Sequence, residues 1–185
     1  ADFRRTPLMV YGIPAVLDAV RKHIFNGLIW PDFSRIPSPE SAFLRFQEIE
    51  LLQPVSLAGR RVTALPVDHT VPAVGYRIDS GAASLVFSGD TGPSDAFWQA
   101  INGIDNLRHI IIECAFPDCE AELAARSKHL CPSMLAQELR KLELACAIHI
   151  SHLKPGQMEL TMSEIDQLLG EFAPKMLRNR QVVEF

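Results

Sequence analysis

The chain has 185 residues, of which 48% are apolar and 22% charged, a balance that excludes an intrinsically disordered protein. The net charge of −4 does not favour nucleic acid as a partner, because binding long phosphate backbones requires a basic surface. The four cysteines lack CxxC spacing, which argues against a structural zinc site. No apolar run reaches the ~20 residues that cross a bilayer, so no contact with a membrane is expected.

The first third of the chain combines one strand and one helix with a long irregular segment. Residues 8–11 form a short apolar run that predicts a buried strand, and Pro14 begins a helical pattern that continues to about Phe25. Residues 26–41 are rich in proline, serine and aromatic residues and are predicted to be irregular. Short strands are predicted next, over residues 48–52, 61–67, 73–78 and 84–88.

After Asp90 the pattern changes to alternating helices and strands. Ser94 is predicted to cap a helix that ends near residue 102, and Ser163 one that ends near residue 172. Between them we expect a strand over 109–113, a helix over 132–144 and a strand over 146–150, with an edge strand over 181–185 at the end. A β-rich half followed by such alternation predicts a layered α/β fold, formed by a single domain over residues 1–185.

Four polar side chains lie at the ends of predicted strands or shortly after them: His69, Asp90, Glu113 and His152. Residues at strand ends commonly carry the chemistry of layered folds, so these four are expected to meet at one rim of the sheet. Imidazole and carboxylate groups are suitable ligands for zinc, manganese or iron held open to substrate. Each residue also has a structural interpretation, as a surface histidine, a turn aspartate or a buried paired glutamate.

The ordered set of motifs resembles the metallo-β-lactamase superfamily. It consists of His69 before Val74-Gly75-Tyr76-Arg77-Ile78, Gly89-Asp90 after an apolar strand, and Ser151-His152 after another. The resemblance implies an αββα sandwich of which this chain is the C-terminal portion. It further implies that His69 binds one metal, that Asp90 bridges two, and that His152 binds the other. The two divalent cations are expected to be Zn²⁺, with Mn²⁺ or Fe²⁺ as alternatives.

Two further segments resemble the phosphodiesterase and tRNA 3′-processing branches of that superfamily: Glu113-Cys114-Ala115-Phe116 and Lys128-His129-Leu130. By this resemblance His129 faces the scissile phosphate, where it stabilises charge or protonates the leaving oxygen, and Glu113 orients His129. Alternatively, His129 only precedes the helix that begins near Pro132. Asp90 completes the expected catalytic set.

The segment from Tyr11 to Phe33 is similar to class II cyclic-nucleotide phosphodiesterases. This similarity implies hydrolysis of cAMP or cGMP to the nucleoside 5′-monophosphate by a metal-bound hydroxide. An RNA phosphodiesterase resembling the tRNA 3′-processing enzymes is the alternative. That branch often carries an RNA-binding arm between the equivalents of His69 and Asp90, where this chain has room only for a short hairpin.

The superfamily's first signature, His-x-His-x-Asp-His, is absent from this sequence. In the family it precedes the strand predicted over residues 8–11, so we expect the chain to be N-terminally incomplete. A non-catalytic scaffold that retains the fold is the hypothesis if the protein begins at Ala1. A cytoplasmic location is expected, or a periplasmic one if a signal peptide lies upstream, and a homodimer is left open.

Overall fold

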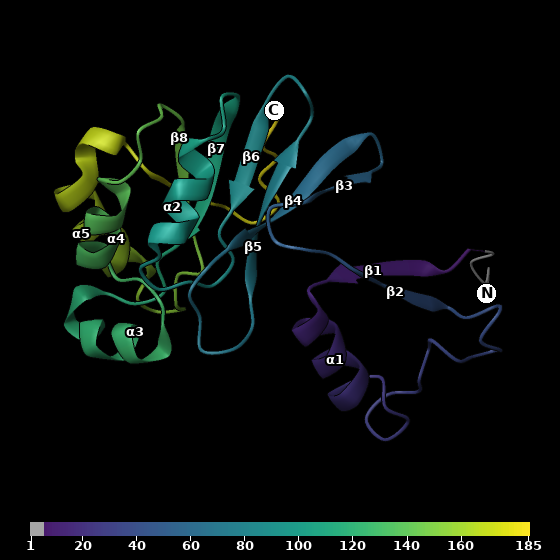
Figure 1. Cartoon of the computed structure of the whole chain (residues 1–185). Helices are drawn as coiled ribbons and strands as arrows, with labels where there is room; N and C mark the ends of the chain where they lie inside the picture. Colours follow the sequence, from purple (N-terminus) through teal and green to yellow (C-terminus); the bar gives the residue numbers. More distant parts are fainter. Residues whose placement is uncertain (1–5) are drawn as a thin grey trace. The chain divides into compact units, whose positions relative to one another are not determined.

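A computed structural model describes residues 6–185, so the first five residues of the expected domain lie outside the described part. The chain divides into two compact units, one ending at Leu51 and the other spanning Leu52–Phe185 (Figure 1). Whether the two units act as the single domain expected from the sequence stays a prediction.

The first unit contains strand β1 (Leu8–Gly12), helix α1 (Pro14–His23) and strand β2 (Leu44–Glu48). Pro14 occupies the first turn of α1, as predicted, where its missing N–H group costs no hydrogen bond. The predicted strand over residues 48–52 is wrong, because the paired segment comes earlier. β2 pairs in parallel with β1 from Leu44 to Glu48, and the pairing ends where β1 reaches Gly12.

The second unit is built on a seven-stranded sheet in the order β3-β4-β5-β6-β7-β8-β9. The strands from β3 to β6 pair antiparallel, and those from β6 to β9 pair parallel. As a result β4, β6, β7 and β8 all run in the same direction. Their bounds are β3 Pro54–Leu57, β4 Arg60–Pro66, β5 Val74–Asp79, β6 Ser84–Phe87, β7 Leu107–Glu113, β8 Ala147–Ser151 and β9 Lys175–Met176.

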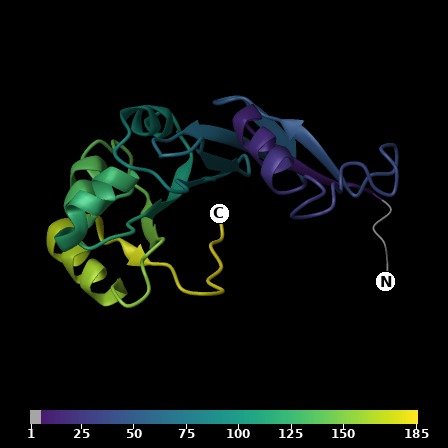
Figure 2. The same ribbon diagram turned by 90° about the horizontal axis from the view of Figure 1, so that it is seen from below.

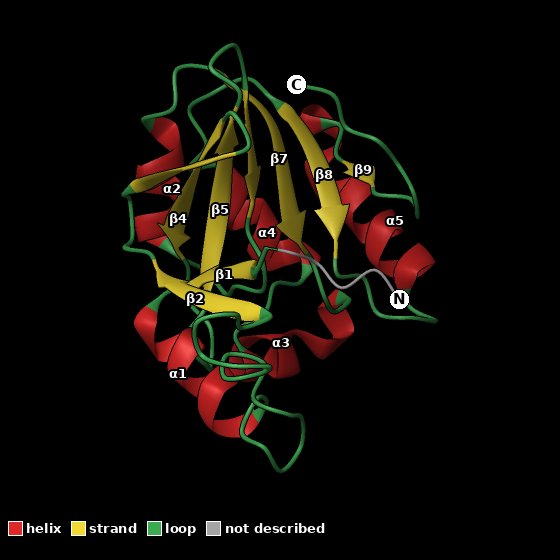
Figure 3. Ribbon diagram, turned by 90° about the vertical axis from the view of Figure 1, so that its right-hand side faces the viewer, coloured by secondary structure: helices red, strands yellow, loops and turns green. Residues whose placement is uncertain are grey.

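Helices cover one face of this sheet. Figure 3 shows α2 (Asp95–Asn102), α4 (Pro132–Leu139) and α5 (Met158–Leu169) behind the strands. The unit also contains α3 (Ala121–Ser127) and the 3₁₀ turns η1 (Asp118–Glu120) and η2 (Gly170–Phe172). The helix-facing side chains of β6, β7 and β8 are fully or almost fully buried, and they form the main core with residues of the three covering helices: Val86, Ile110, Ile112, Ile148, Ile150, Phe97, Ile101, Leu135, Leu139, Ile165 and Leu169. Burial of this apolar surface is the main stabilising contribution to the unit.

Helix boundaries follow the sequence only in part. Ser94 caps α2 as predicted, since its side chain accepts a hydrogen bond from the Phe97 N–H. Ser163 does not begin a helix, because α5 starts at Met158 and buries Thr161, Ile165 and Leu169 at helical spacing. The predicted helix over 132–144 ends earlier, at Leu139.

The C-terminal segment also differs from the prediction. The sheet ends with β9, and residues 181–185 form no strand but an irregular segment that leads to the C-terminus (Figure 2). In the described part of the chain, no helix is both long enough and apolar enough to cross a membrane.

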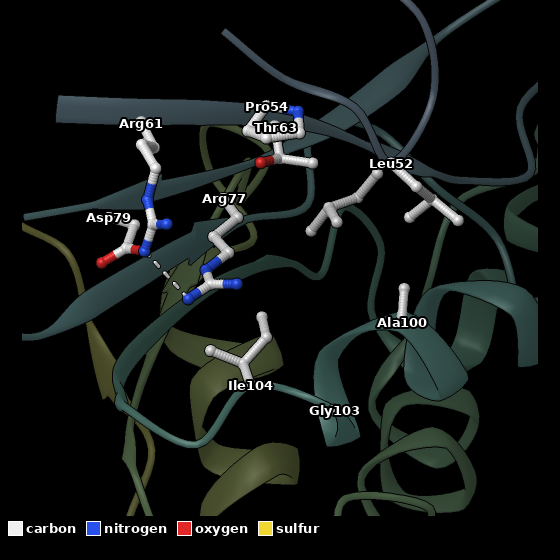
Figure 4. A pocket seen from close by; sticks show the side chains of 10 residues that line it. Leu52, Pro54, Arg61, Thr63, Arg77, Asp79, Ala100, Gly103 and Ile104 are labelled. Carbon is white, nitrogen blue, oxygen red and sulfur yellow. Dashed lines mark hydrogen bonds and ion pairs between the residues drawn. The ribbon is translucent and has the colours of Figure 1, made fainter. Parts of the chain in front are cut away.

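An ion-pair network closes the sheet end where β4 begins and β5 finishes. Asp79 is almost fully buried, and its carboxylate accepts hydrogen bonds from the Gly81 N–H (2.8 Å), Asn106 Nδ2 (3.1 Å), Arg61 Nη2 (2.5 Å) and Arg77 Nη2 (3.1 Å). Both arginines line a cavity of about 250 Å³ (Figure 4). Because Asp79 is saturated by four donors, we interpret this end of the sheet as structural.

Candidate metal centre

The candidate site lies at the other end of these strands. Since β4, β6, β7 and β8 run in the same direction, their carboxyl ends meet at one rim. His69, Asp90 and His152 follow β4, β6 and β8, and Glu113 is the last residue of β7. Two of the turns require left-handed backbone: Gly89 has φ 63° immediately before Asp90, and His152 itself has φ 61°. Such a conformation is strained for a non-glycine residue and is concentrated at functional sites.

The ligand-type atoms at this rim lie close together. One donor atom each from His69, Asp90 and His129 lies within 4.8 Å of the others. His152 Nδ1 is 3.3 Å from Asp90 Oδ1, and both side chains are more than one-third exposed. Two ligand atoms that share one tetrahedral zinc lie about 3.3–3.4 Å apart, given bonds of about 2.0–2.1 Å. The Asp90–His152 pair has this spacing, and the donor types of the whole cluster suit a divalent metal.

A backbone carbonyl orients His69 within this cluster. His69 Nδ1 lies 3.0 Å from the Lys128 carbonyl oxygen, which can only accept, so Nδ1 carries the proton and Nε2 keeps its lone pair. Lys128 ends α3 in a left-handed conformation (φ 54°). Its ammonium group pairs with Asp68 at 2.6 Å. The residue preceding His69 and the residue preceding His129 are thereby held together.

Glu113 and His129 form a buried pair behind the exposed ligands. Glu113 is completely buried, and its Oε1 lies 2.7 Å from His129 Nδ1. The carboxylate also accepts hydrogen bonds from the N–H groups of Thr91 (2.8 Å, to Oε1) and Leu130 (3.2 Å, to Oε2). The four residues come from three separate segments, so Glu113 fixes the loops as well as the imidazole.

Burial dominates the electrostatics of this pair. It raises the pKa of Glu113 to about 7, and the N–H groups of Thr91 and Leu130 oppose the rise. Burial also lowers the pKa of His129; His69 and Lys154 add to that effect, whereas the Asp90 carboxylate opposes it. Burial thus brings the pKa of Glu113 into the neutral range and favours the neutral imidazole form of His129.

The structure brings all five sequence-predicted site residues together: His69, Asp90, Glu113, His129 and His152. Their division into metal ligands and catalytic groups stays a prediction. One departure concerns His129, which was expected only to face the phosphate but lies among the ligand-type atoms with His69 and Asp90. Its ring stacks on that of His152, with centroids 5.1 Å apart. The sequence offered no signal for this arrangement, because His129 follows a helix rather than a strand.

Comparisons with known proteins identify the family and the fold of this chain. The sequence profile of the family described as "Beta-lactamase superfamily domain" matches residues 2–168. A Yersinia pestis protein named "Probable 3′,5′-cyclic-nucleotide phosphodiesterase" is 28% identical over 85% of this chain and 54% of its own length. A Mycobacterium tuberculosis protein named "Putative ribonuclease Z" is 41% identical over 29% of this chain and 25% of its own.

Among solved structures, unliganded yeast PDE1 superimposes with a TM-score of 0.77 at 18% identity, covering 93% of this chain and 58% of that one. The expected α/β metallo-β-lactamase fold is confirmed. The chain spans about half the length of the Yersinia pestis relative that it matches.

Proposed function

We propose, starting from the fact that this chain belongs to the beta-lactamase superfamily, that it is part of a metal-dependent phosphodiesterase. The substrate that we propose is a 3′,5′-cyclic nucleotide, cAMP or cGMP, which is hydrolysed to the nucleoside 5′-monophosphate. The observation that carries the proposal is the cluster of His69, Asp90 and His129 donor atoms within 4.8 Å, with His152 beside Asp90. A cytoplasmic location belongs to the same proposal.

In this proposal His69, Asp90 and His152 would be ligands of the divalent cations, and Zn²⁺ is the expected metal. The bound cations would polarise the phosphoryl group and supply an activated water at neutral pH. The exposed edges of Asp90 and His152 leave room for substrate at that point. His69 contributes Nε2 because its Nδ1 donates to the Lys128 carbonyl.

The Glu113–His129 pair would supply the proton that the leaving group needs. With Glu113 beside Nδ1, the imidazolium form of His129 is stabilised by a carboxylate and presents its Nε2–H to the site. From there it stabilises the phosphate or protonates the departing 3′-oxygen. Burial lowers the pKa of His129, which makes the imidazolium a stronger acid.

The test is metal analysis on the purified full-length protein combined with cAMP and cGMP hydrolysis before and after chelation. We expect about two metals per chain in the complete site. Activity should disappear on chelation and return with Zn²⁺ or Mn²⁺. A metal-loaded protein that is inert toward both nucleotides but hydrolyses another phosphodiester would refute the cyclic-nucleotide assignment. Absence of both metal and turnover would favour the non-catalytic scaffold.

RNA is the second candidate substrate, on the strength of the local similarity to ribonuclease Z. Against it, the chain between His69 and Asp90 is occupied by β5, β6 and the tight turn around Gly81, which leaves no protruding arm. Cleavage of a precursor tRNA at low enzyme concentration, without cyclic-nucleotide turnover, would establish this candidate instead.

A further inference from the structure

Lys154 lies two residues after His152, in the loop that leads from β8 to α5. Its ammonium nitrogen is 5.1 Å from the centre of the Phe116 ring, a cation–π contact that orients the side chain. The same ring meets the His129 ring edge-on, with centroids 5.7 Å apart. Phe116 is therefore a common neighbour of Lys154 and His129 at the rim of the candidate metal centre.

The charge of Lys154 is not neutralised by the fold. Among residues 6–185 no ion pair joins Lys154 to a carboxylate, whereas Lys128 pairs with Asp68, and Lys141 with Asp95 and Glu138. The Lys154 side chain is only half-buried, so its ammonium group can reach a bound ligand. An ammonium group that is oriented by an aromatic ring and has no carboxylate partner is suited to bind an anion.

We propose that Lys154 is a substrate-binding residue that contacts a non-bridging oxygen of the phosphodiester, and that Phe116 positions it. This inference rests on the proposed phosphodiesterase function and names the group that recognises the charged part of its substrate. Negative charge increases on the non-bridging oxygens as the leaving oxygen departs. A fixed cation at that place therefore stabilises the transition state as well as the bound substrate.

The direct test is the affinity for inorganic phosphate, measured by isothermal titration calorimetry on metal-loaded protein from which free metal has been removed. We expect Lys154→Ala to weaken phosphate binding about tenfold, and Lys154→Arg to stay within about threefold of the wild type. The control is Lys175→Ala, which removes an exposed lysine from β9 and should leave the affinity unchanged. Adenosine, which has no phosphate, should bind equally to wild type and Lys154→Ala.

A kinetic measurement accompanies the binding test. Lys154→Ala should lower kcat/KM toward cAMP about tenfold, with Lys154→Arg recovering most of it. If Lys154→Ala fails to fold, Lys154→Met retains a side chain that packs on Phe116 without the charge. Unchanged phosphate affinity in the folded Lys154 variants, or an equal loss in Lys175→Ala, would overturn the inference. If phosphate binding depends on Lys154 while wild type hydrolyses no cyclic nucleotide, the proposed substrate is wrong and the anion-binding role stands.

Discussion

Replacing Glu113 by glutamine tests two roles of its buried carboxylate, which stabilises the fold and supports the His129 side chain. The carboxylate accepts from the Thr91 N–H on one oxygen and from the Leu130 N–H on the other. A glutamine amide has one accepting oxygen and one NH₂ group, so in either orientation the NH₂ group faces one of these N–H groups. A buried donor left without a partner costs about 1–3 kcal/mol. We therefore expect the free energy of unfolding to fall by about 2 kcal/mol.

Glu138→Gln is the matched control. Glu138 is almost fully buried, and its carboxylate accepts from the Ser94 N–H (3.0 Å), Trp98 Nε1 (2.7 Å) and Lys141 Nζ (2.6 Å). It therefore also loses an acceptor in a buried site, with a similar expected cost of about 1–3 kcal/mol. Trp98 lies in α2 and Lys141 follows α4, whereas Ser94 is the N-cap of α2 at the end of the loop that carries Asp90. None of the three contacts one of the candidate ligands through Glu138.

The two variants separate stability from activity. Urea unfolding monitored by circular dichroism should show similar losses for both. Turnover of cAMP at saturating metal should fall about 100-fold or more in Glu113→Gln only, because the carboxylate that supports the His129 imidazolium is gone. A Glu113→Gln protein as stable as the wild type would contradict the hydrogen-bond argument. An equal loss of turnover in Glu138→Gln would show that activity follows general stability.

Three further predictions concern other parts of the second unit. Asp79→Asn should lower the free energy of unfolding by about 2 kcal/mol at pH 7. The Gly81 N–H and the other donors hold the pKa of Asp79 below its usual value. The stabilisation that the Asp79 carboxylate provides is therefore complete above about pH 4 and is lost as the pH falls. Urea unfolding at about pH 3 should accordingly show a smaller difference in stability between wild type and Asp79→Asn than at pH 7. Gly75→Ala should cost about 1–3 kcal/mol in the same assay, because its Cβ would lie 2.9 Å from the Phe87 carbonyl oxygen, whereas Gly170→Ala meets no neighbour within 4 Å and should be neutral. Chelation should lower the melting temperature of the wild type but not of Asp90→Ala, and an equal shift in both would exclude Asp90 as a ligand.

The strands that carry the candidate site could be predicted because each contains a short apolar run with a polar residue at its end or shortly after it. β7 and β8 contain Ile110, Ile112, Ile148 and Ile150, all buried, and this pattern is typical of parallel strands covered by helices. Since the sheet brings the carboxyl ends of such strands to one rim, the residues that follow them meet there.

The missed elements lack such a pattern. β3 has only four residues and begins with Pro54, a residue that usually argues against a strand and is tolerated here because β3 lies at the sheet edge. α3 buries only Ala124, so its sequence has no apolar face to recognise. The segment 181–185 contains apolar residues but pairs with no strand among residues 6–185, and a strand needs a neighbour to bond with.

The contacts that orient the site side chains are absent from any local pattern. His69 meets the Lys128 carbonyl 59 residues away, and Lys154 meets Phe116 across two different loops. Each contact depends on where the loops lie in space, which residue types and spacing do not encode. The sequence therefore identifies the candidate ligands, and the tertiary structure supplies their tautomers and neighbours.

Asp79 and Asp90 show what separates a structural carboxylate from a candidate ligand in the same sheet. Both are aspartates at or near strand ends, and the sequence separates them only through the motif around Asp90. Asp79 is almost fully buried and has four donors on its two oxygens, so no lone pair is left for a cation. The Asp90 side chain is 41% exposed and lies 3.3 Å from an imidazole that is itself a metal ligand by type. A fold that needed Asp90 only for stability would have bonded its oxygens as it bonds those of Asp79, and its open carboxylate is therefore the stronger argument that this rim binds a metal.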